Sequence, residues 1–142
     1  FTKENQSFEI GKANILKDGN DVSIFATGHL VWEALEAQKI LKEEGISAEI
    51  INIHTIKPLD EKSILKSVMK TKCVVTAEEH MLNGGLGDSI AQYLSTTLPT
   101  PIEMIGVNDT FGESGTPRDL MIKYGLSSDN IIESARKVIS RK

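Results

Sequence analysis

The chain has 142 residues, of which 39% are hydrophobic and 25% are charged, and its formal net charge is −4. This size and balance are typical of one globular domain. A net acidic chain gives no reason to expect nucleic-acid binding, which requires clustered lysines and arginines, and no run of about 18 apolar residues is present to cross a membrane. The one basic cluster, Arg136, Lys137, Arg141 and Lys142, is interpreted as the solvated end of the last helix. We therefore expect a single domain over residues 1–142 that binds neither nucleic acid nor a membrane.

The first strand is expected within residues 8–20, ahead of an apolar strand at 21–27. Asp18 and Gly19 between them form a hairpin-type turn signal. The first strand is therefore predicted to run antiparallel to the second strand or to lie at an edge of the sheet.

Helical patterns and apolar runs then alternate along the chain. Helices are expected over 29–45, 61–71, 87–98, 116–125 and 127–142, and strands over 47–56, 72–79 and 102–109. Gly45 is a fitting stop for the first helix, and Asp60 is a fitting N-cap for the second. Repeated strand–helix units predict a three-layer α/β/α domain with a mainly parallel sheet.

Cysteine usage and the start of the chain bear on where the protein acts. Cys73, the one cysteine, lies in an apolar run with no basic group beside it at strand spacing, which indicates a buried, unreactive thiol in a reducing compartment. No signal peptide is recognisable, so we expect a cytoplasmic protein. Because the sequence begins with Phe1, we expect a piece of a longer chain, with residues 1–7 as a flexible lead-in from an upstream domain.

Polar residues gather where the predicted strands end, which is where open α/β sheets bind ligands. The three histidines, His29, His54 and His80, all fall in these positions. None is spaced like a helical ligand pair, and His29 is expected to face solvent at the start of a helix, so a zinc site is not favoured.

Glu78 and Glu79 are adjacent in a predicted strand, so their side chains should point to opposite faces of the sheet. They are therefore not expected to act together as a carboxylate dyad. We expect one of them to face the strand ends and the other to reach a neighbouring backbone or a partner.

The glycine cluster "NGGLGDS" at residues 83–89 allows two interpretations. It could hold an anion at a helix N-terminus, but it is neither a dinucleotide-binding loop nor a P-loop. We favour a tight turn, with positive φ at Gly84 or Gly85 and close helix packing at Gly87. The later "GESGTP" does not match the serine-hydrolase motif, because Thr116 stands where the last glycine belongs.

A family resemblance covers the chain from about Phe8 to Val138 and is carried by three stretches: "SIFATGHLVWEALEAQKILKEEGISAEIINIHTIKPLDEKSI", "VVTAEEHMLNGGLGDSIA" and "DTFGESGTPRDLMIKYGL". Together they resemble the C-terminal domain of transketolase. "HTIKPLD" and "EEH…GGLG" are shared by the wider group of thiamine-diphosphate enzymes. The third stretch discriminates, because it is similar to the form in bacterial and archaeal transketolases, some of which are split into two chains.

The resemblance implies a five-stranded mixed, mostly parallel sheet with one antiparallel strand. It also implies a homodimeric enzyme of the pentose phosphate pathway that transfers a two-carbon ketol unit between sugar phosphates. In that family thiamine diphosphate and a divalent metal such as Mg²⁺ lie between a pyrophosphate-binding and a pyrimidine-binding domain, and neither domain is in this chain. The resemblance thus assigns no catalytic, cofactor-binding or metal residue here, and the isolated chain is expected to be inactive.

What remains is a supporting role in the assembly of the enzyme. The candidate inter-domain or anion-contact positions are Glu79, His80, Gly84, Gly85, Gly87, Asp109, Glu113 and Ser114. Two alternatives stay open within the wider group, the β subunit of a 2-oxo acid dehydrogenase and deoxyxylulose-phosphate synthase. A third, of another class, is a free-standing module that binds an anion or a protein partner at the strand ends.

Overall fold

The structure, a computed structural model, describes residues 12–54, 58–81, 85–107 and 127–142. Within these ranges the strands are β1 (Asn14–Lys17), β2 (Val22–Ala26), β3 (Ala48–Asn52), β4 (Val74–Met81) and β5 (Ile102–Val107). The helices are α1 (Leu30–Glu43), α2 (Glu61–Thr71), α3 (Leu86–Thr97) and α5 (Ser128–Ser140). The predicted lead-in at 1–7 and the predicted helix at 116–125 lie outside the described residues.

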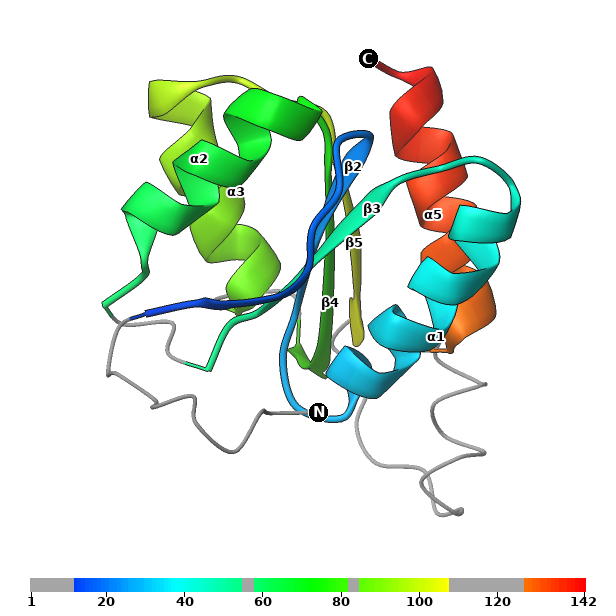
Figure 1. Cartoon of the computed structure of the whole chain (residues 1–142). Helices are drawn as coiled ribbons and strands as arrows, with labels where there is room; N and C mark the ends of the chain where they lie inside the picture. Colours follow the sequence, from blue (N-terminus) through cyan, green and yellow to red (C-terminus); the bar gives the residue numbers. More distant parts are fainter. Residues whose placement is uncertain (1–11, 55–57, 82–84, 108–126) are drawn as a thin grey trace.

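The elements form three layers, which confirms the predicted α/β/α architecture. The helices α1 and α5 cover one face of the sheet, and α2 and α3 cover the other (Figure 1). The strand order is β1-β3-β2-β4-β5. β2, β3, β4 and β5 run parallel to one another, and β1 is antiparallel to β3, so the sheet is mixed as the resemblance implied.

The predicted pairing of β1 with β2 is wrong, and the edge alternative is correct. The chain between them is held by the start of β3, because the Asp21 N–H donates to the Ser47 carbonyl at 2.8 Å and the Ser47 N–H donates to the Asp21 carboxylate at 2.7 Å. Gly19 lies so close to this segment that a Cβ would stand 2.3 Å from the carbonyl carbon of Ala48. The turn therefore passes across the start of β3, and β1 pairs with β3 on the side away from β2.

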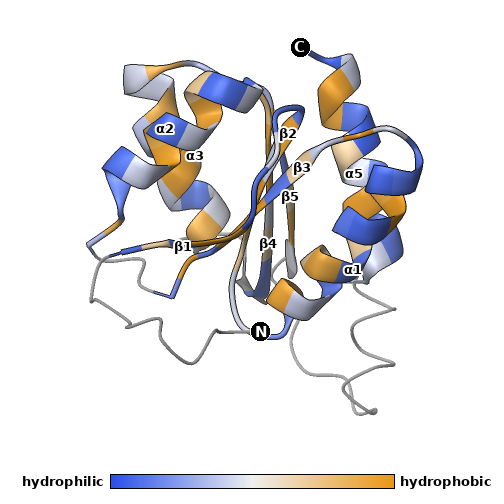
Figure 2. Ribbon diagram, viewed as in Figure 1, coloured by the Kyte–Doolittle hydropathy of each residue, from blue (hydrophilic) through white to orange (hydrophobic). Residues whose placement is uncertain are grey.

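Successive residues of the central strands belong alternately to two separate hydrophobic clusters, one on each face of the sheet. In β2, Ile24 is buried in the cluster beneath α1 and α5, whereas Phe25 is buried in the one beneath α2 and α3. This alternation is the two-residue period of an extended strand. Figure 2 shows the apolar side of each helix turned towards the sheet, so both faces of the central strands are covered.

Local capping signals in the sequence set two helix ends as predicted. Gly45, just after α1, has φ +81°, a left-handed conformation that favours glycine. Asp60 caps α2, accepting hydrogen bonds from the Ser63 N–H at 3.2 Å and from the Ala13 N–H at 2.8 Å. Burial raises the pKa of the Asp60 carboxyl, but the hydrogen bonds from Ala13 and Ser63 outweigh it and bring the pKa below its ordinary value.

The edge strand β5 is tied to the end of α5 by charged side chains. The Arg141 guanidinium donates to the Ile102 carbonyl at 3.1 Å and to the Glu103 carboxylate. The Lys137 ammonium lies 3.5 Å from the same carboxylate. One of the outward-facing carbonyls of this edge therefore has a partner within the domain.

Candidate functional site

The strand-end edge comprises residues at or just after the carboxyl ends of β2, β3 and β4. It contains Gly28 and His29 after β2, His54 after β3, and Glu78 to His80 in the last part of β4. These strands are neighbours in the sheet, and α1 and α3 both begin at this edge (Figure 1). His29 and His54 are exposed. The structure thus gathers the residues that the sequence placed at strand ends.

Glu78 caps the N-terminus of α3. Its side chain is fully buried, and its two oxygens accept hydrogen bonds from the Leu86 N–H at 2.8 Å and the Gly87 N–H at 2.7 Å. These are first-turn N–H groups without a partner inside the helix. Gly85, the N-cap residue, has no side chain to serve them. Glu78 supplies the missing acceptor and places negative charge at the positive end of the helix dipole.

Glu79 makes the corresponding contact on the other face of the sheet. Its carboxylate accepts a hydrogen bond of 2.5 Å from the N–H of His29, the N-cap residue of α1. Gly28 permits this approach, because its φ is +57° and a Cβ there would lie 2.6 Å from the Glu79 carboxylate oxygen. The predicted opposite orientation of the two glutamates is confirmed, but both of them bind neighbouring backbone, where only one was expected to do so.

The glycine cluster is a helix start rather than a left-handed turn in its described part. Positive φ was predicted at Gly84 or Gly85; Gly84 lies outside the described residues, and Gly85 does not have it, since its φ is −90° and its backbone is extended, as an N-cap residue requires. Close packing at Gly87 is confirmed, because a Cβ there would lie 2.7 Å from Thr76 Oγ1 and 3.0 Å from Met104 Sδ. Gly87 is buried inside the domain, and its N–H already binds Glu78. The two N–H groups at this helix start therefore hold the protein's own anion.

The other candidate positions are only partly covered. His80 lies within β4, and Gly84, Asp109, Glu113 and Ser114 lie outside the described residues. In the described part of the chain, no group of three or more His, Cys, Asp or Glu side chains is arranged to hold a metal ion. The residues present there do not provide a ligand set for Mg²⁺.

A second buried polar cluster lies beneath α2, away from the strand-end edge. Ser23 Oγ is 2.6 Å from both Ser67 Oγ and Thr71 Oγ1, Ser67 donates to Glu49 at 2.6 Å, and Lys70 Nζ lies 2.8 Å from the other Glu49 oxygen. The Glu49 carboxylate is buried and has two partners, so this network fixes the packing of α2.

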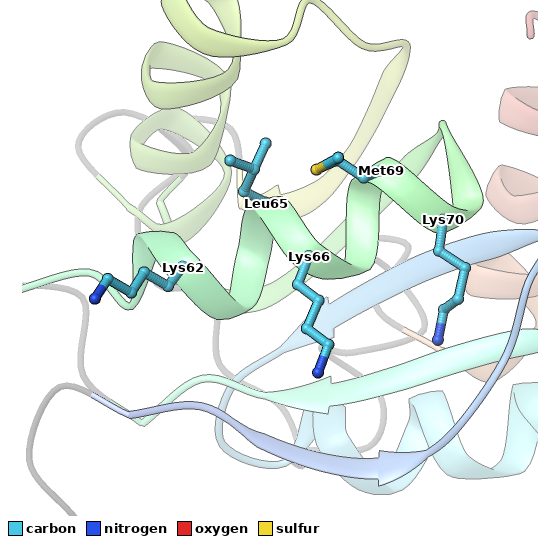
Figure 3. A pocket seen from close by; sticks show the side chains of 5 residues that line it. All are labelled: Lys62, Leu65, Lys66, Met69 and Lys70. Carbon is cyan, nitrogen blue, oxygen red and sulfur yellow. The ribbon is translucent and has the colours of Figure 1, made fainter.

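The outer face of α2 carries a shallow depression (Figure 3). It is lined by Lys62, Leu65, Lys66, Met69 and Lys70. None of these residues follows a strand end, and Met69 is the most exposed of the large hydrophobic side chains in the described residues, at 62%. The depression has no acid/base pair and does not extend the strand-end edge.

Thr76→Val is expected to raise the free energy of unfolding by about 1 kcal/mol, because Thr76 Oγ1 is fully buried and has no hydrogen-bond partner among the described residues, and valine has the same shape without the hydroxyl. Urea denaturation would measure this. Thr71→Val is the matched control, since Thr71 Oγ1 does have a partner, and its loss should lower the same free energy by about 1 kcal/mol. If both variants changed the free energy of unfolding in the same direction, the interpretation of Thr76 Oγ1 as an unpaired hydroxyl would be contradicted.

Cys73 is expected to resist alkylation in the folded protein. Burial raises the pKa of its thiol to about 11, so only about one thiol in a thousand is ionised at pH 8, and its Sγ also donates to the Asp21 carbonyl at 3.2 Å. We expect iodoacetamide to modify the native protein at least about 100-fold more slowly than the urea-unfolded protein. Similar rates in the two states would show that the thiol is accessible. The prediction of a buried cysteine is confirmed.

Sequence patterns missed the contacts of Glu78 and Glu79 because their partners are not close in the sequence. His29 is 50 residues from Glu79, and Leu86 and Gly87 are 8 and 9 residues from Glu78. The nearest signal was the absence of Ser, Thr, Asp or Asn at the N-cap position Gly85, which leaves the start of α3 in need of an acceptor. None of the helices in the described ranges combines the length and the apolar character needed to span a lipid bilayer.

Comparison with known proteins places these features in a family. Residues 11–131 match the family model described as "Transketolase, C-terminal domain". The chain is 47% identical over 139 residues to the 6-deoxy-6-sulfo-D-fructose transketolase subunit of Clostridium sp., covering 98% of this chain and 43% of that protein. It is 38% identical over 128 residues to a 1-deoxy-D-xylulose-5-phosphate synthase of Desulforudis audaxviator, covering 89% of this chain and 20% of that protein.

A solved structure supports the same relationship. The fold matches a split-gene transketolase, described as an inactive beta4 tetramer, with a TM-score of 0.93 and 42% identity, covering 98% of this chain and 46% of that chain. The chain thus spans less than half the length of these relatives. The extent of the family match and the shared fold show that the chain belongs to the transketolase C-terminal domain family.

Proposed function

We propose that this chain supports the assembly of a transketolase that transfers a two-carbon ketol unit from a ketose phosphate to an aldose phosphate in carbohydrate metabolism. The observation that carries the proposal is the use of Glu78 and Glu79, whose carboxylates bind the N–H groups that start α3 and α1. An acid/base pair would need these groups free to exchange protons with a substrate. Here they shape a fixed surface instead.

The partners in this proposal are the pyrophosphate-binding and pyrimidine-binding parts of the same enzyme, which bind thiamine diphosphate and Mg²⁺ and supply the carbanion chemistry. The strand-end edge meets them through Glu79 and His80. The proposal includes Gly84, Asp109, Glu113 and Ser114 as further contacts, and Gly85 as the residue that sets the start of α3. A homodimer of the complete cytoplasmic enzyme is part of the same proposal.

The decisive test is complementation. This chain is mixed with the remaining part of the enzyme, thiamine diphosphate and Mg²⁺, and ketol transfer between sugar phosphates is measured. We expect no turnover by this chain alone and activity that rises with its concentration to saturation. Turnover by the isolated chain, or full activity of the remaining part without it, would overturn the proposal.

The donor is tested in the same assay. A relative with 47% identity is named for 6-deoxy-6-sulfo-D-fructose, so this compound and an ordinary ketose phosphate are tested in parallel as ketol donors. The identity of 38% with a 1-deoxy-D-xylulose-5-phosphate synthase supports a second candidate function, the corresponding domain of such a synthase. Formation of 1-deoxy-D-xylulose 5-phosphate without ketol transfer would favour this second candidate.

Two variants test the strand-end edge as the contact surface. Glu79→Gln should weaken saturation in the complementation assay, raising the concentration of chain needed for half-maximal activity by about threefold to tenfold. Glu36→Gln is the matched control, because Glu36 is an exposed carboxylate on the solvent side of α1. Gly85→Ala is expected to impair stability and assembly. If Glu79→Gln, Gly85→Ala and Glu36→Gln all assemble like the parent chain, the contact surface lies elsewhere.

A further inference from the structure

The last part of β4 extends beyond the regular strand pairing. Against β2, the parallel register ends at the pair Ala26–Ala77, followed by one hydrogen bond from the Thr27 N–H to the Ala77 carbonyl at 3.1 Å. Against β5, the register shifts between Ala77 and Met81. Glu78 and Glu79 therefore lie in a stretch that the regular ladder does not hold on either side. Irregularities of this kind redirect side chains near strand ends.

Side chains hold this stretch instead. Glu78 binds the first turn of α3 with two hydrogen bonds of 2.8 and 2.7 Å, and Glu79 binds the start of α1 with one. The two helices lie on opposite faces of the sheet (Figure 1). Neighbouring residues of an extended chain point to opposite faces, so one peptide unit connects both contacts.

We propose that the Glu78–Glu79 pair couples the N-terminal turns of α1 and α3 across the sheet. The Glu78 carboxylate is fully buried, so releasing α3 would leave a buried charge without partners. When the first turn of α3 shifts, Glu78 follows it and moves the adjoining backbone, and Glu79 passes this movement to the start of α1. Gly28 leaves the space for the Glu79 carboxylate, and Gly87 lets the start of α3 pack close to Thr76 and Met104.

The coupling goes beyond the proposed function and does not depend on it. A molecule that contacts one helical layer at the strand-end edge would change the stability of the helix start in the other layer. Two helical layers on opposite faces of the sheet would then respond as one unit.

Amide hydrogen exchange of this chain, resolved by residue, tests the coupling. Glu79→Gln should speed exchange at the His29 amide by about fivefold, since its amide oxygen can still accept the hydrogen bond but without the charge that strengthens it. The proposal requires that the same variant also speed exchange at the Leu86 and Gly87 amides by about threefold or more. Glu78→Gln should have the reciprocal effect, with the larger change in α3 and the smaller one at His29.

Asp60→Asn is the matched control, because Asp60 is also a carboxylate that caps a helix start but is not part of β4. It should speed exchange at the Ser63 amide and leave the exchange rates of His29, Leu86 and Gly87 within about twofold of the parent chain. A lower global stability would speed exchange at all amides alike, so this common change is subtracted first. If both glutamine variants change only their own helix, the coupling is absent. Should Glu78→Gln not fold, Glu79→Gln alone decides, through the α3 amides.

Discussion

Glu78→Ala is expected to lower the free energy of unfolding by about 3–5 kcal/mol, a large part of the 5–15 kcal/mol of an ordinary domain. The variant removes the acceptor of two buried N–H groups, those of Leu86 and Gly87, and each hydrogen bond to a charged group contributes about 1.5–3 kcal/mol. A cavity in a fully buried position adds to the loss. Urea denaturation followed by circular dichroism would measure it.

Two further variants test whether this loss comes from the Glu78 hydrogen bonds. Glu78→Gln keeps the shape and one carbonyl acceptor but presents an NH₂ group to the second N–H, so its loss should be about half as large. Glu36→Ala, at an exposed position on α1, should change the free energy of unfolding by less than about 0.5 kcal/mol. If Glu78→Ala stayed within about 1 kcal/mol of the parent chain, the buried carboxylate would not be stabilising α3.

The second large effect is expected from Gly19→Ala, with a loss of about 3 kcal/mol in the free energy of unfolding. The added Cβ would lie 2.3 Å from the carbonyl carbon of Ala48 and 2.4 Å from the nitrogen of Glu49. Both atoms belong to the backbone of β3, which cannot turn aside as a flexible side chain can. The turn would have to lift away from β3, which weakens the contacts between residues 20–21 and Ser47.

Gly45→Ala separates this overlap from the general cost of replacing a glycine. No atom in the described part of the chain lies within 4 Å of a Cβ at Gly45, but its φ is +81°, so alanine there costs about 1 kcal/mol through backbone strain alone. Urea denaturation midpoints of the two variants, converted to free energies of unfolding with one common slope, give the difference between the two losses. A loss for Gly19→Ala no larger than that for Gly45→Ala would contradict the close approach to β3.

Local signals were enough to predict much of the fold. The limits of α2 agree with the prediction of 61–71, because Asp60 is adjacent to the helix that it caps. Apolar runs located β2, β3, β4 and β5, although β3 is shorter than predicted, at Ala48–Asn52. Such signals are properties of neighbouring residues, and they need no knowledge of the rest of the chain.

The features that depend on distant residues could not be read in this way. The cap on α1 joins His29 to Glu79, 50 residues later, and the Asp18-Gly19 signal was local evidence for a hairpin that tertiary contacts with Ser47 override. At the candidate site, the pattern gave the positions and the opposite orientation of Glu78 and Glu79. It could not give their partners, because these are set by how the helices return to the sheet.

The contact between Arg141 and the Ile102 carbonyl has a consequence for the behaviour of the protein at high concentration. An open edge of a sheet is a template on which a strand of another molecule can add, and repeated addition leads to aggregation. Because the Arg141 side chain lies over this edge, an incoming strand would have to displace its charge-assisted contacts with Ile102 and Glu103 before it could pair with β5. The helix that closes one side of the domain thereby also protects it from growing into a fibre.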